Sequence, residues 1–412
     1  MWPIIYAFDP GAQGEIPVKL YEAVAEKYGY IIAGSNNSQN FNPRAQSMGS
    51  RAMIQDTLER FAIDQNRVYL TGFSGGARVA TAIAVNCVGR CRVAGVVASG
   101  ATYPADVTPS AKDSFLYFVG LGDTDFNYPE VVKLQLARDR FGLPFRMRLF
   151  PGPHQWSPAD VFEQAIAWFQ LHAIQEHRIP GDDTFLQDQF THAVDEYKSA
   201  HEAHDALREF FALRSLIDFK GLKEISEYEH RLQELKASAE LKKAFDSERK
   251  QAEEQRDLED DVAKAVAQFA EPDVPPDQRM QIKSTILSGL TTLKDKGHRA
   301  KDETQPKVHQ RAFNALFAMI VEEGQKRQAV SKFGDALPYY EIVEEAAPER
   351  AWPHLLAAET HLEMGNKKRA IQAIERAVAT GRIDAGVLQA DRDLAPLFDD
   401  PEFKKIVERL KN

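Results

Sequence analysis

The stretch Gly-Phe-Ser-Gly-Gly at residues 72–76 constrains the fold of this chain more than any other feature. It lies between a run at 67–71, which predicts a buried strand, and an Ala-rich run at 77–84, which predicts a helix. A G-x-S-x-G sequence between a strand and a helix is typical of a sharp turn that exposes the serine above the edge of a sheet. Small residues must flank the serine, because a Cβ there would collide with neighbouring backbone. Ser74 is therefore a candidate nucleophile; the alternative is a tight turn that only packs a helix on a sheet.

Apolar and amphipathic runs alternate over about the first 175 residues. The apolar runs predict strands at 4–8, 30–34, 68–71, 93–99, 115–120 and 146–150. The amphipathic runs predict helices at 18–28, 45–61, 76–85, 129–141 and 159–174. Continuous apolar strands separated by helices are typical of a parallel sheet covered on both faces. The predicted fold class is therefore α/β, with a mostly parallel, doubly wound sheet and a ligand site beyond the carboxyl ends of its strands.

The composition changes after about residue 180, where strand patterns stop and Glu, Lys, Gln, Ala and Leu dominate. We expect long helices over 184–270, including one at 232–270 whose mixed charges form a solvated face. A Pro-rich break at 271–276 precedes two further predicted helices, at 277–293 and 306–323. The sequence thus predicts three parts: an α/β domain at 1–178, a helical linker region at 179–305 and a helical repeat domain at 306–412.

The C-terminal part contains an internal repeat with a period of 34 residues. Its matching positions are Ala336, Tyr340, Val343 and Ala346 in one copy and Ala370, Ile374, Ala377 and Thr380 in the next. A helix–turn–helix period of this length with small residues at the crossing points is typical of tetratricopeptide (TPR) repeats. The alternative is an ordinary helical hairpin with a similar spacing.

A serine hydroxyl needs a base at hydrogen-bond distance, and the base needs a carboxylate that orients it. After a G-x-S-x-G turn the partners follow in the order acid, then histidine. Two acids, Asp123 and Asp125, follow the strand predicted at 115–120, and Asp125 is the favoured one. His154 follows the last predicted strand, in a turn before a helix. We expect Ser74, Asp125 and His154 to meet at one edge of the sheet.

A negative charge that develops on a substrate oxygen needs two N–H donors. The amide of Gly75, next to the candidate nucleophile, is the first. The second is expected in the loop after the first strand, where Pro10 has no N–H, so that either Asp9 or Gly11 must donate.

Two further residues are candidates for the substrate pocket. Trp156 follows the candidate histidine, and Asn37 belongs to the polar run at 35–40, which leaves the second strand at the same edge of the sheet. The alternatives are that Trp156 only seals the core beneath it and that the polar run is a turn-rich loop.

Composition excludes several classes of function. A net charge of −10 argues against a protein that binds nucleic acid or an anionic membrane surface, and no apolar run is long enough to span a bilayer. Cys87 and Cys91 are too few for a structural zinc site, so they form either a short disulfide or two free thiols. His201 and His204 lack metal-protease spacing and are expected on a solvated helix face. The sequence thus implies no metal and no cofactor.

The order and flanks of these motifs resemble the α/β-hydrolase superfamily, above all its small esterase branch of polyhydroxybutyrate-depolymerase-like and dienelactone-hydrolase-like proteins. The resemblance covers about residues 1–175 and rests on the motifs at 72–77, 125–128 and 152–156. It differs from the family at residues 9–10, where Asp-Pro replaces the usual His-Gly, and in strands that would precede residue 1.

The resemblance implies that Ser74 is the nucleophile, His154 the general base and acid, and Asp125 the orienting acid. It implies a serine hydrolase that cleaves small or polymeric carboxylic esters through an acyl-enzyme. A serine peptidase of the same fold and a catalytically degenerate interaction scaffold are the alternatives. We also expect that residues upstream of this chain, with a targeting segment, are missing from it, and that the protein is exported.

The stretch from about 351 to 410 resembles a TPR protein, and the motifs at 391–397 and 400–403 resemble the capping segment of bacterial repeat arrays. That resemblance implies a bacterial hydrolase fused to a module that binds a protein or peptide partner.

Overall fold

The computed structural model describes residues 1–142, 144–299 and 304–411 of the chain. Contacts within the chain group it into two compact units, Met1–Glu254 and Gln255–Asn412. Each unit is described by itself below, and the three-part division at residues 178 and 305 remains a prediction.

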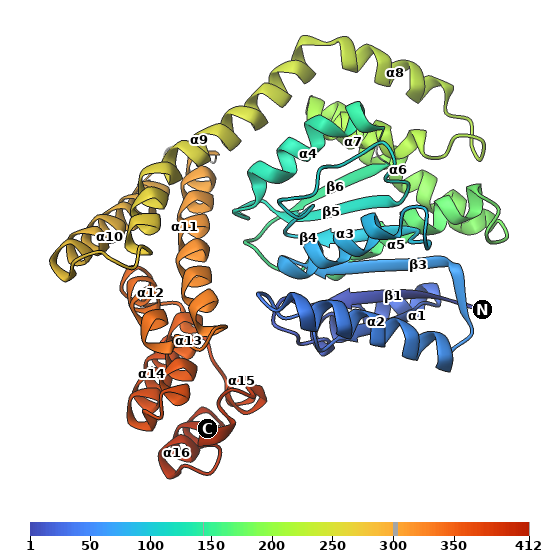
Figure 1. Ribbon diagram of the computed structural model, residues 1–412. Coiled ribbons are helices and arrows are strands. Elements are labelled where there is room, and N and C mark those ends of the chain that lie inside the picture. Colours follow the sequence, from blue (N-terminus) through green and yellow to red (C-terminus); the bar gives the residue numbers. More distant parts are fainter. Residues whose placement is uncertain (143, 300–303, 412) are drawn as a thin grey trace. The chain divides into compact units, whose positions relative to one another are not determined.

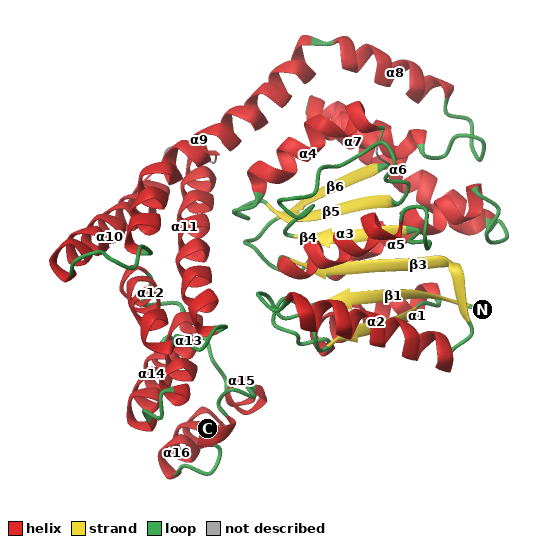
Figure 2. Ribbon diagram, in the orientation of Figure 1, coloured by secondary structure: helices red, strands yellow, loops and turns green. Residues whose placement is uncertain are grey.

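A six-stranded parallel sheet forms the centre of the first unit (Figures 1 and 2). Its strands are β1 Trp2–Phe8, β2 Ile31–Ser35, β3 Ile63–Phe73, β4 Gly95–Ser99, β5 Leu116–Gly122 and β6 Phe145–Phe150. They lie in the order β2-β1-β3-β4-β5-β6, and every neighbouring pair is parallel. This arrangement confirms the predicted α/β class and places the ends of β1, β3, β4, β5 and β6 along one edge.

Strand β3 is longer than the sequence predicts, because polar residues precede its apolar core. Asp64 and Arg67 form an ion pair of 2.8 Å within the strand, which keeps both polar groups paired. Trp2 pairs with Ile63 and Ile4 with Val68, so a shift in register separates the polar start of β3 from its apolar end.

Helices cover both faces of this sheet. They are α1 Glu15–Tyr28, α2 Pro43–Arg60, α3 Gly75–Cys87, α4 Tyr128–Phe141 and α5 Ala159–Gln175. Successive residues of β1 show how the two faces divide, since side chains alternate along a strand. Tyr6 packs in the core with α2, α3 and α4, whereas Ile5 packs in the core with α1 and α5.

The rest of the first unit is helical. Its elements are α6 Asp183–Glu202, α7 Ala206–Ile217, α8 Ser226–Ala237 and the first part of α9 Ala239–Phe269. Apolar residues of α6, α7 and α8 pack with Leu171 and Ile174 at the end of α5. The single helix predicted at 232–270 is interrupted, because Ser238 is extended and its hydroxyl accepts the N–H of Leu241 at 3.1 Å.

The second unit contains only helices among its described residues, in agreement with the predicted loss of strands. They are the end of α9, then α10 Pro276–Arg299, α11 Thr304–Gln328, α12 Phe333–Ala346, α13 Ala351–Glu363, α14 Lys367–Ala379, α15 Ala385–Ala390, the short 3-10 helix η1 Ala395–Leu397 and α16 Pro401–Lys411. Ala336, Ala358, Ala370 and Ala377 are fully buried where these helices pack. Assignment of the hairpins to the TPR class stays a prediction. No helix in the described part of the chain is long and apolar enough to cross a membrane.

Close packing of α3 on the sheet depends on Gly76. A Cβ at this position would lie 1.9 Å from the carbonyl oxygen of Phe8 in β1. We expect Gly76→Ala to lower the free energy of unfolding by about 1–3 kcal/mol or more, because backbone must move to admit the methyl group. Urea unfolding followed by circular dichroism measures this effect. Gly181→Ala is the control, since no atom lies within 4 Å of its added Cβ; equal midpoints for the two variants would contradict the expectation.

Candidate active site

Ser74 occupies a strained turn between β3 and α3. Its backbone angles are φ 53° and ψ −120°, a conformation that residues with a side chain rarely adopt. A Cβ on Gly72 would lie 2.2 Å from the carbonyl oxygen of Gly76, so the strand and the helix approach as closely as glycine allows. The N–H of Ser74 donates to the carbonyl of Ser99 at 2.9 Å, which fixes the turn to the end of β4. The strained geometry at a half-buried serine is what the motif predicts.

His154 and Asp125 form a hydrogen-bonded pair at the same edge. Nδ1 of His154 lies 2.9 and 3.0 Å from the two carboxylate oxygens of Asp125. Asp125 is fully buried, whereas the side chain of His154 is 16% exposed. Asp125 also accepts the N–H of Asn127 at 2.8 Å, which orients the carboxylate. This geometry holds the imidazole with Nε2 directed away from the acid.

Gly100 makes room for this pair after β4. Its φ is +68°, and a Cβ on it would lie 3.0 Å from both the carboxylate of Asp125 and the ring of His154. The sequence analysis did not single out Gly100, although a glycine directly after a predicted strand is the signal that could have found it.

Asp123, the alternative acid, contacts a different part of the site. Its carboxylate accepts the N–H of Gly152 at 3.1 Å, and its own N–H donates to the carbonyl of Phe150. Thr124 donates from its hydroxyl to the carbonyl of Gly152 at 2.8 Å. These bonds tie the loop after β5 to the loop that carries His154, so Asp123 supports the histidine loop while Asp125 contacts the histidine itself.

Aromatic rings surround His154. The ring centroids of Phe73 and Phe126 lie 4.6 and 4.1 Å from that of the imidazole. Because Phe73 directly precedes Ser74, the imidazole lies beside the nucleophile turn. Within the residues that the structure describes, no hydrogen bond joins the Ser74 hydroxyl to Nε2 of His154. Among the described residues, the structure thus brings Asp125 and His154 into contact but joins neither of them to the Ser74 hydroxyl by a hydrogen bond.

Trp156 is fixed to the loop after β1 rather than left free at the site. Its Nε1–H donates to the buried carboxylate of Asp9 at 3.1 Å, and its ring lies 5.8 Å from that of Phe73. Asn37 is exposed and packs against Gly49 of α2, where a Cβ on the glycine would lie 2.3 Å from that of Asn37. Trp156 is therefore next to the candidate triad, while Asn37 contacts the helix beyond it.

The N–H of Gly11, one expected donor to a developing negative charge, already has a partner. It donates to the carboxylate of Asp9 at 2.8 Å, and the same carboxylate accepts the N–H of Gln13 at 3.2 Å. Gly75 begins α3, so its N–H belongs to the first turn, where helical N–H groups have no partner in the helix. The side chain of Asn40 lies directly against Gly75; the sequence analysis indicated the polar run at 35–40 that contains Asn40, but it chose Asn37 from that run.

Cys87 and Cys91 form a disulfide, one of the two alternatives that the sequence left open. It closes the turn that ends α3, and both cysteines line a cavity of about 400 Å³. Ala94 and Phe115, which precede β4 and β5, also line it, so this cavity lies at the amino ends of the strands. The candidate triad lies at the opposite edge of the sheet.

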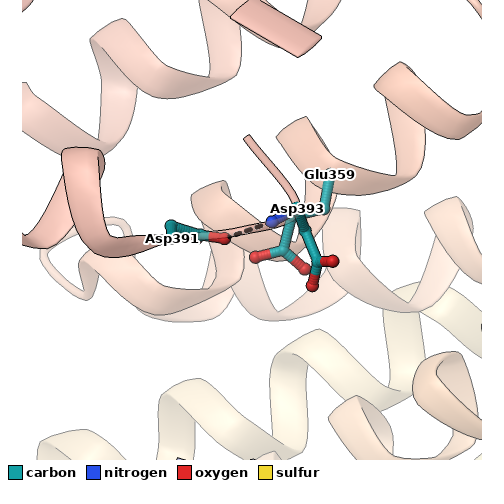
Figure 3. Close-up of side chains that lie close together, drawn as sticks. All are labelled: Glu359, Asp391 and Asp393. Carbon is teal, nitrogen blue, oxygen red and sulfur yellow. Dashed lines mark hydrogen bonds between the residues drawn. The ribbon is translucent and has the colours of Figure 1, made fainter. Parts of the chain in front are cut away.

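One group of acidic side chains in the described part of the chain is close enough to hold a cation. The carboxylates of Glu359, Asp391 and Asp393 lie within 4.8 Å of one another in the second unit (Figure 3). Asp391 accepts the N–H of Asp393 at 2.9 Å, so one of its carboxylate oxygens already has a hydrogen-bond partner. Burial first, and then the neighbouring acids Asp391 and Asp393, raise the pKa of Glu359 well above its usual range. Burial also raises the pKa of Asp391, so two of the three carboxyl groups lose their charge more readily than exposed ones do.

Several solved structures match about two fifths of this chain. An S-formylglutathione hydrolase from Staphylococcus aureus matches 41% of this chain and 81% of its own, at 15% identity and a TM-score of 0.33. A fluorophosphonate-binding serine hydrolase of the same organism matches 41% and 84%, at 14% identity and a TM-score of 0.33. A ferulic acid esterase matches 40% and 81%, at 17% identity and a TM-score of 0.30. No protein-family model and no curated protein matches the chain. At such low similarity, the chemistry must be inferred from the geometry of the site.

The raised pKa of Glu359 predicts that the stability of the fold depends on pH. A carboxyl whose pKa is higher in the folded than in the unfolded state stabilises the fold at low pH, and this contribution is lost as the pH rises above the unfolded value of about 4.3. We therefore expect Glu359→Gln to be more stable than the wild type at pH 8 and to lose this advantage near pH 4.5. Thermal unfolding at the two pH values measures the difference. Glu363→Gln, an exposed substitution on the same helix, is the control; equal pH dependence of all three proteins would contradict the assignment.

Proposed function

We propose that the first unit is a serine hydrolase that cleaves carboxylic esters through an acyl-enzyme on Ser74. The observation that carries this proposal is the His154–Asp125 pair, 2.9 Å apart, at the same sheet edge as a serine in a strained strand–turn–helix conformation. A structural turn needs no such conformation, and backbone strain persists where the surrounding structure enforces it, often at functional sites. The combination supports nucleophilic catalysis over simple packing.

In the proposed mechanism, the Ser74 oxygen attacks the ester carbonyl carbon while Nε2 of His154 takes the hydroxyl proton. Asp125 accepts the Nδ1–H of the imidazole and stabilises the imidazolium that forms. The N–H of Gly75 donates to the oxyanion of the tetrahedral intermediate. Collapse of this intermediate expels the alcohol, which receives the proton from His154. Water then attacks the acyl group by the same sequence and releases the acid.

The space around Ser74 supports small or polymeric esters as substrates. The chain between Ser74 and His154 consists of α3, β4, β5, α4, β6 and their connections, so no separate lid domain is inserted there. Ser74 is half-buried and remains accessible to solvent. The same triad serves amide hydrolysis, which makes a serine peptidase the nearest alternative.

A catalytically degenerate domain is the second candidate function. Two observations favour it: the Ser74 hydroxyl is not hydrogen-bonded to His154 among the described residues, and the N–H of Gly11 is engaged by Asp9. In that case the protein would act as a scaffold, with the second unit binding a protein or peptide partner. Catalytic hydrogen bonds are often long or absent before substrate binds, so we retain the hydrolase as the first proposal. We infer a partner-binding role for the second unit in either case, on the basis of its repeat sequence.

Covalent labelling tests the proposed nucleophile. We expect a fluorophosphonate probe to modify the wild-type protein at Ser74, with the adduct located by peptide mapping, because the probe traps an activated serine. Ser74→Ala should lose the label and lower the rate of p-nitrophenyl acetate hydrolysis by at least about a thousandfold, toward the rate that binding and the oxyanion donors alone supply. An unlabelled wild-type protein would favour the scaffold instead.

Two matched substitutions test the assignment of the acid. We expect Asp125→Asn to lower kcat by about 10⁴-fold, because an amide at this position favours the wrong tautomer of His154. Asp123→Asn keeps an oxygen that can accept the N–H of Gly152, so its kcat should fall less than about tenfold. Hydrolysis of p-nitrophenyl acetate under saturating conditions measures both. The reverse order of effects would transfer the role to Asp123.

A further inference from the structure

We propose that the side-chain amide of Asn40 is the second donor to the oxyanion. This inference rests on the proposed hydrolase function and assigns a catalytic role to one residue of the polar run at 35–40, of which the sequence analysis had chosen only Asn37. It follows from two sets of observations: the N–H groups of the loop after β1 are directed or bonded elsewhere, and the Asn40 amide lies unpaired beside the first donor.

The loop after β1 has no N–H to spare for substrate. Pro10 has none, and the N–H groups of Gly11 and Gln13 donate to the Asp9 carboxylate at 2.8 and 3.2 Å. The N–H of Ala12 donates to the Asp9 carbonyl at 3.0 Å. The N–H of Asp9 is the remaining donor of residues 9–13.

The direction of the Asp9 N–H follows from that of the carbonyl before it. The preceding carbonyl, that of Phe8, is directed at α3, since a Cβ on Gly76 would lie 1.9 Å from its oxygen. No peptide bond in the described residues is cis, and a trans peptide directs its C=O and N–H to opposite sides. The N–H of Asp9 is therefore directed to the side opposite Gly76, away from α3.

Asn40 is at the right place to supply the missing donor. Its Oδ1 lies 1.9 Å, and its Nδ2 3.0 Å, from the point that a Cβ on Gly75 would occupy. The carboxamide therefore rests against the residue whose N–H is the first donor. It forms no hydrogen bond with any residue in the described part of the chain, so both of its N–H groups are available. A half-turn about the Cβ–Cγ bond exchanges the amide oxygen and nitrogen without changing the shape of the side chain.

The loop that carries Asn40 is held in place by its own hydrogen bonds. The N–H of Asn40 donates to the carbonyl of Pro10 at 2.9 Å, and the hydroxyl of the fully buried Ser38 donates to the carbonyl of Asp9 at 2.6 Å. Gln46 of α2 donates from its side chain to the carbonyl of Gln39 at 2.9 Å. A donor held in this way before substrate binds needs little reorganisation in the transition state, which is the property that makes oxyanion donors effective.

Three variants separate a donor from a packing residue, with kcat and KM for p-nitrophenyl acetate as the readout. Removal of one oxyanion donor lowers kcat by about 10²–10³-fold, so we expect Asn40→Ala to show a loss of this size with KM changed less than about threefold. Asn40→Asp keeps the size and shape of the side chain but puts a negative charge beside the oxyanion. We expect it to lose at least as much activity as Asn40→Ala. Gln39→Ala, an exposed change on the same loop, should retain the wild-type kcat.

The outcomes distinguish this inference from the proposed function. An active, fluorophosphonate-labelled wild type with an unchanged kcat in Asn40→Ala would overturn the role of Asn40 alone. The same holds if Asn40→Asp retains activity that Asn40→Ala loses, since that pattern indicates packing. A wild-type protein that neither hydrolyses the ester nor reacts at Ser74 would overturn both proposals. Thermal unfolding of each variant shows whether the fold is intact.

Discussion

The contact of α3 with the sheet determines where every part of the candidate site can lie. Ser74 stands at φ 53°, a conformation that costs about 1–3 kcal/mol and persists only where neighbouring structure enforces it. The enforcing contacts are backbone against backbone: Gly72 against Gly76, and Gly76 against the carbonyl of Phe8. Because these contacts leave no room for a Cβ, the serine is held at the tip of the turn, above the ends of β1 and β4. Asp125 and His154 lie at the same edge of the sheet, in the loops after β5 and β6.

Three loops that are distant in sequence are joined around this serine. The loop after β5 is bonded to the histidine loop through Asp123 and Gly152, at 3.1 Å. The histidine loop is bonded in turn to the loop after β1, through Trp156 and the Asp9 carboxylate. Asp9 uses its carboxylate to organise both its own loop and the tryptophan, and these hydrogen bonds connect the two loops.

Continuous apolar strands made most of the α/β architecture predictable from sequence, since the central strands β1, β4 and β5 are buried on both faces. The polar start of β3 escaped prediction because the Asp64–Arg67 pair hides a strand behind charged residues. The break at Ser238 escaped because a serine that caps a helix and one that lies within a solvated helix look alike in a charged run. The sequence narrowed the acid to Asp123 or Asp125, and only coordinates show which one bonds with His154. The sequence indicated the polar run at 35–40 as a pocket candidate, but it could not single out Asn40 within that run, because its position beside Gly75 depends on how the loop folds.

The Ser74 hydroxyl, which has no hydrogen-bond partner among the described residues, fits the proposed mechanism. His154 is fixed on one side by Asp125 and on its faces by Phe73 and Phe126, so the base has little freedom left. Ser74 has a rigid backbone but a single side-chain torsion, and its hydroxyl has no hydrogen-bond partner among the described residues. If Gly75 and Asn40 hold the carbonyl oxygen of a substrate, its carbonyl carbon would lie next to the Ser74 oxygen. The hydroxyl proton of Ser74 would then be directed toward Nε2 of His154. In the proposed mechanism, substrate binding would complete the relay, because Ser74 is the member of the candidate triad whose side chain has no hydrogen-bond partner among the described residues.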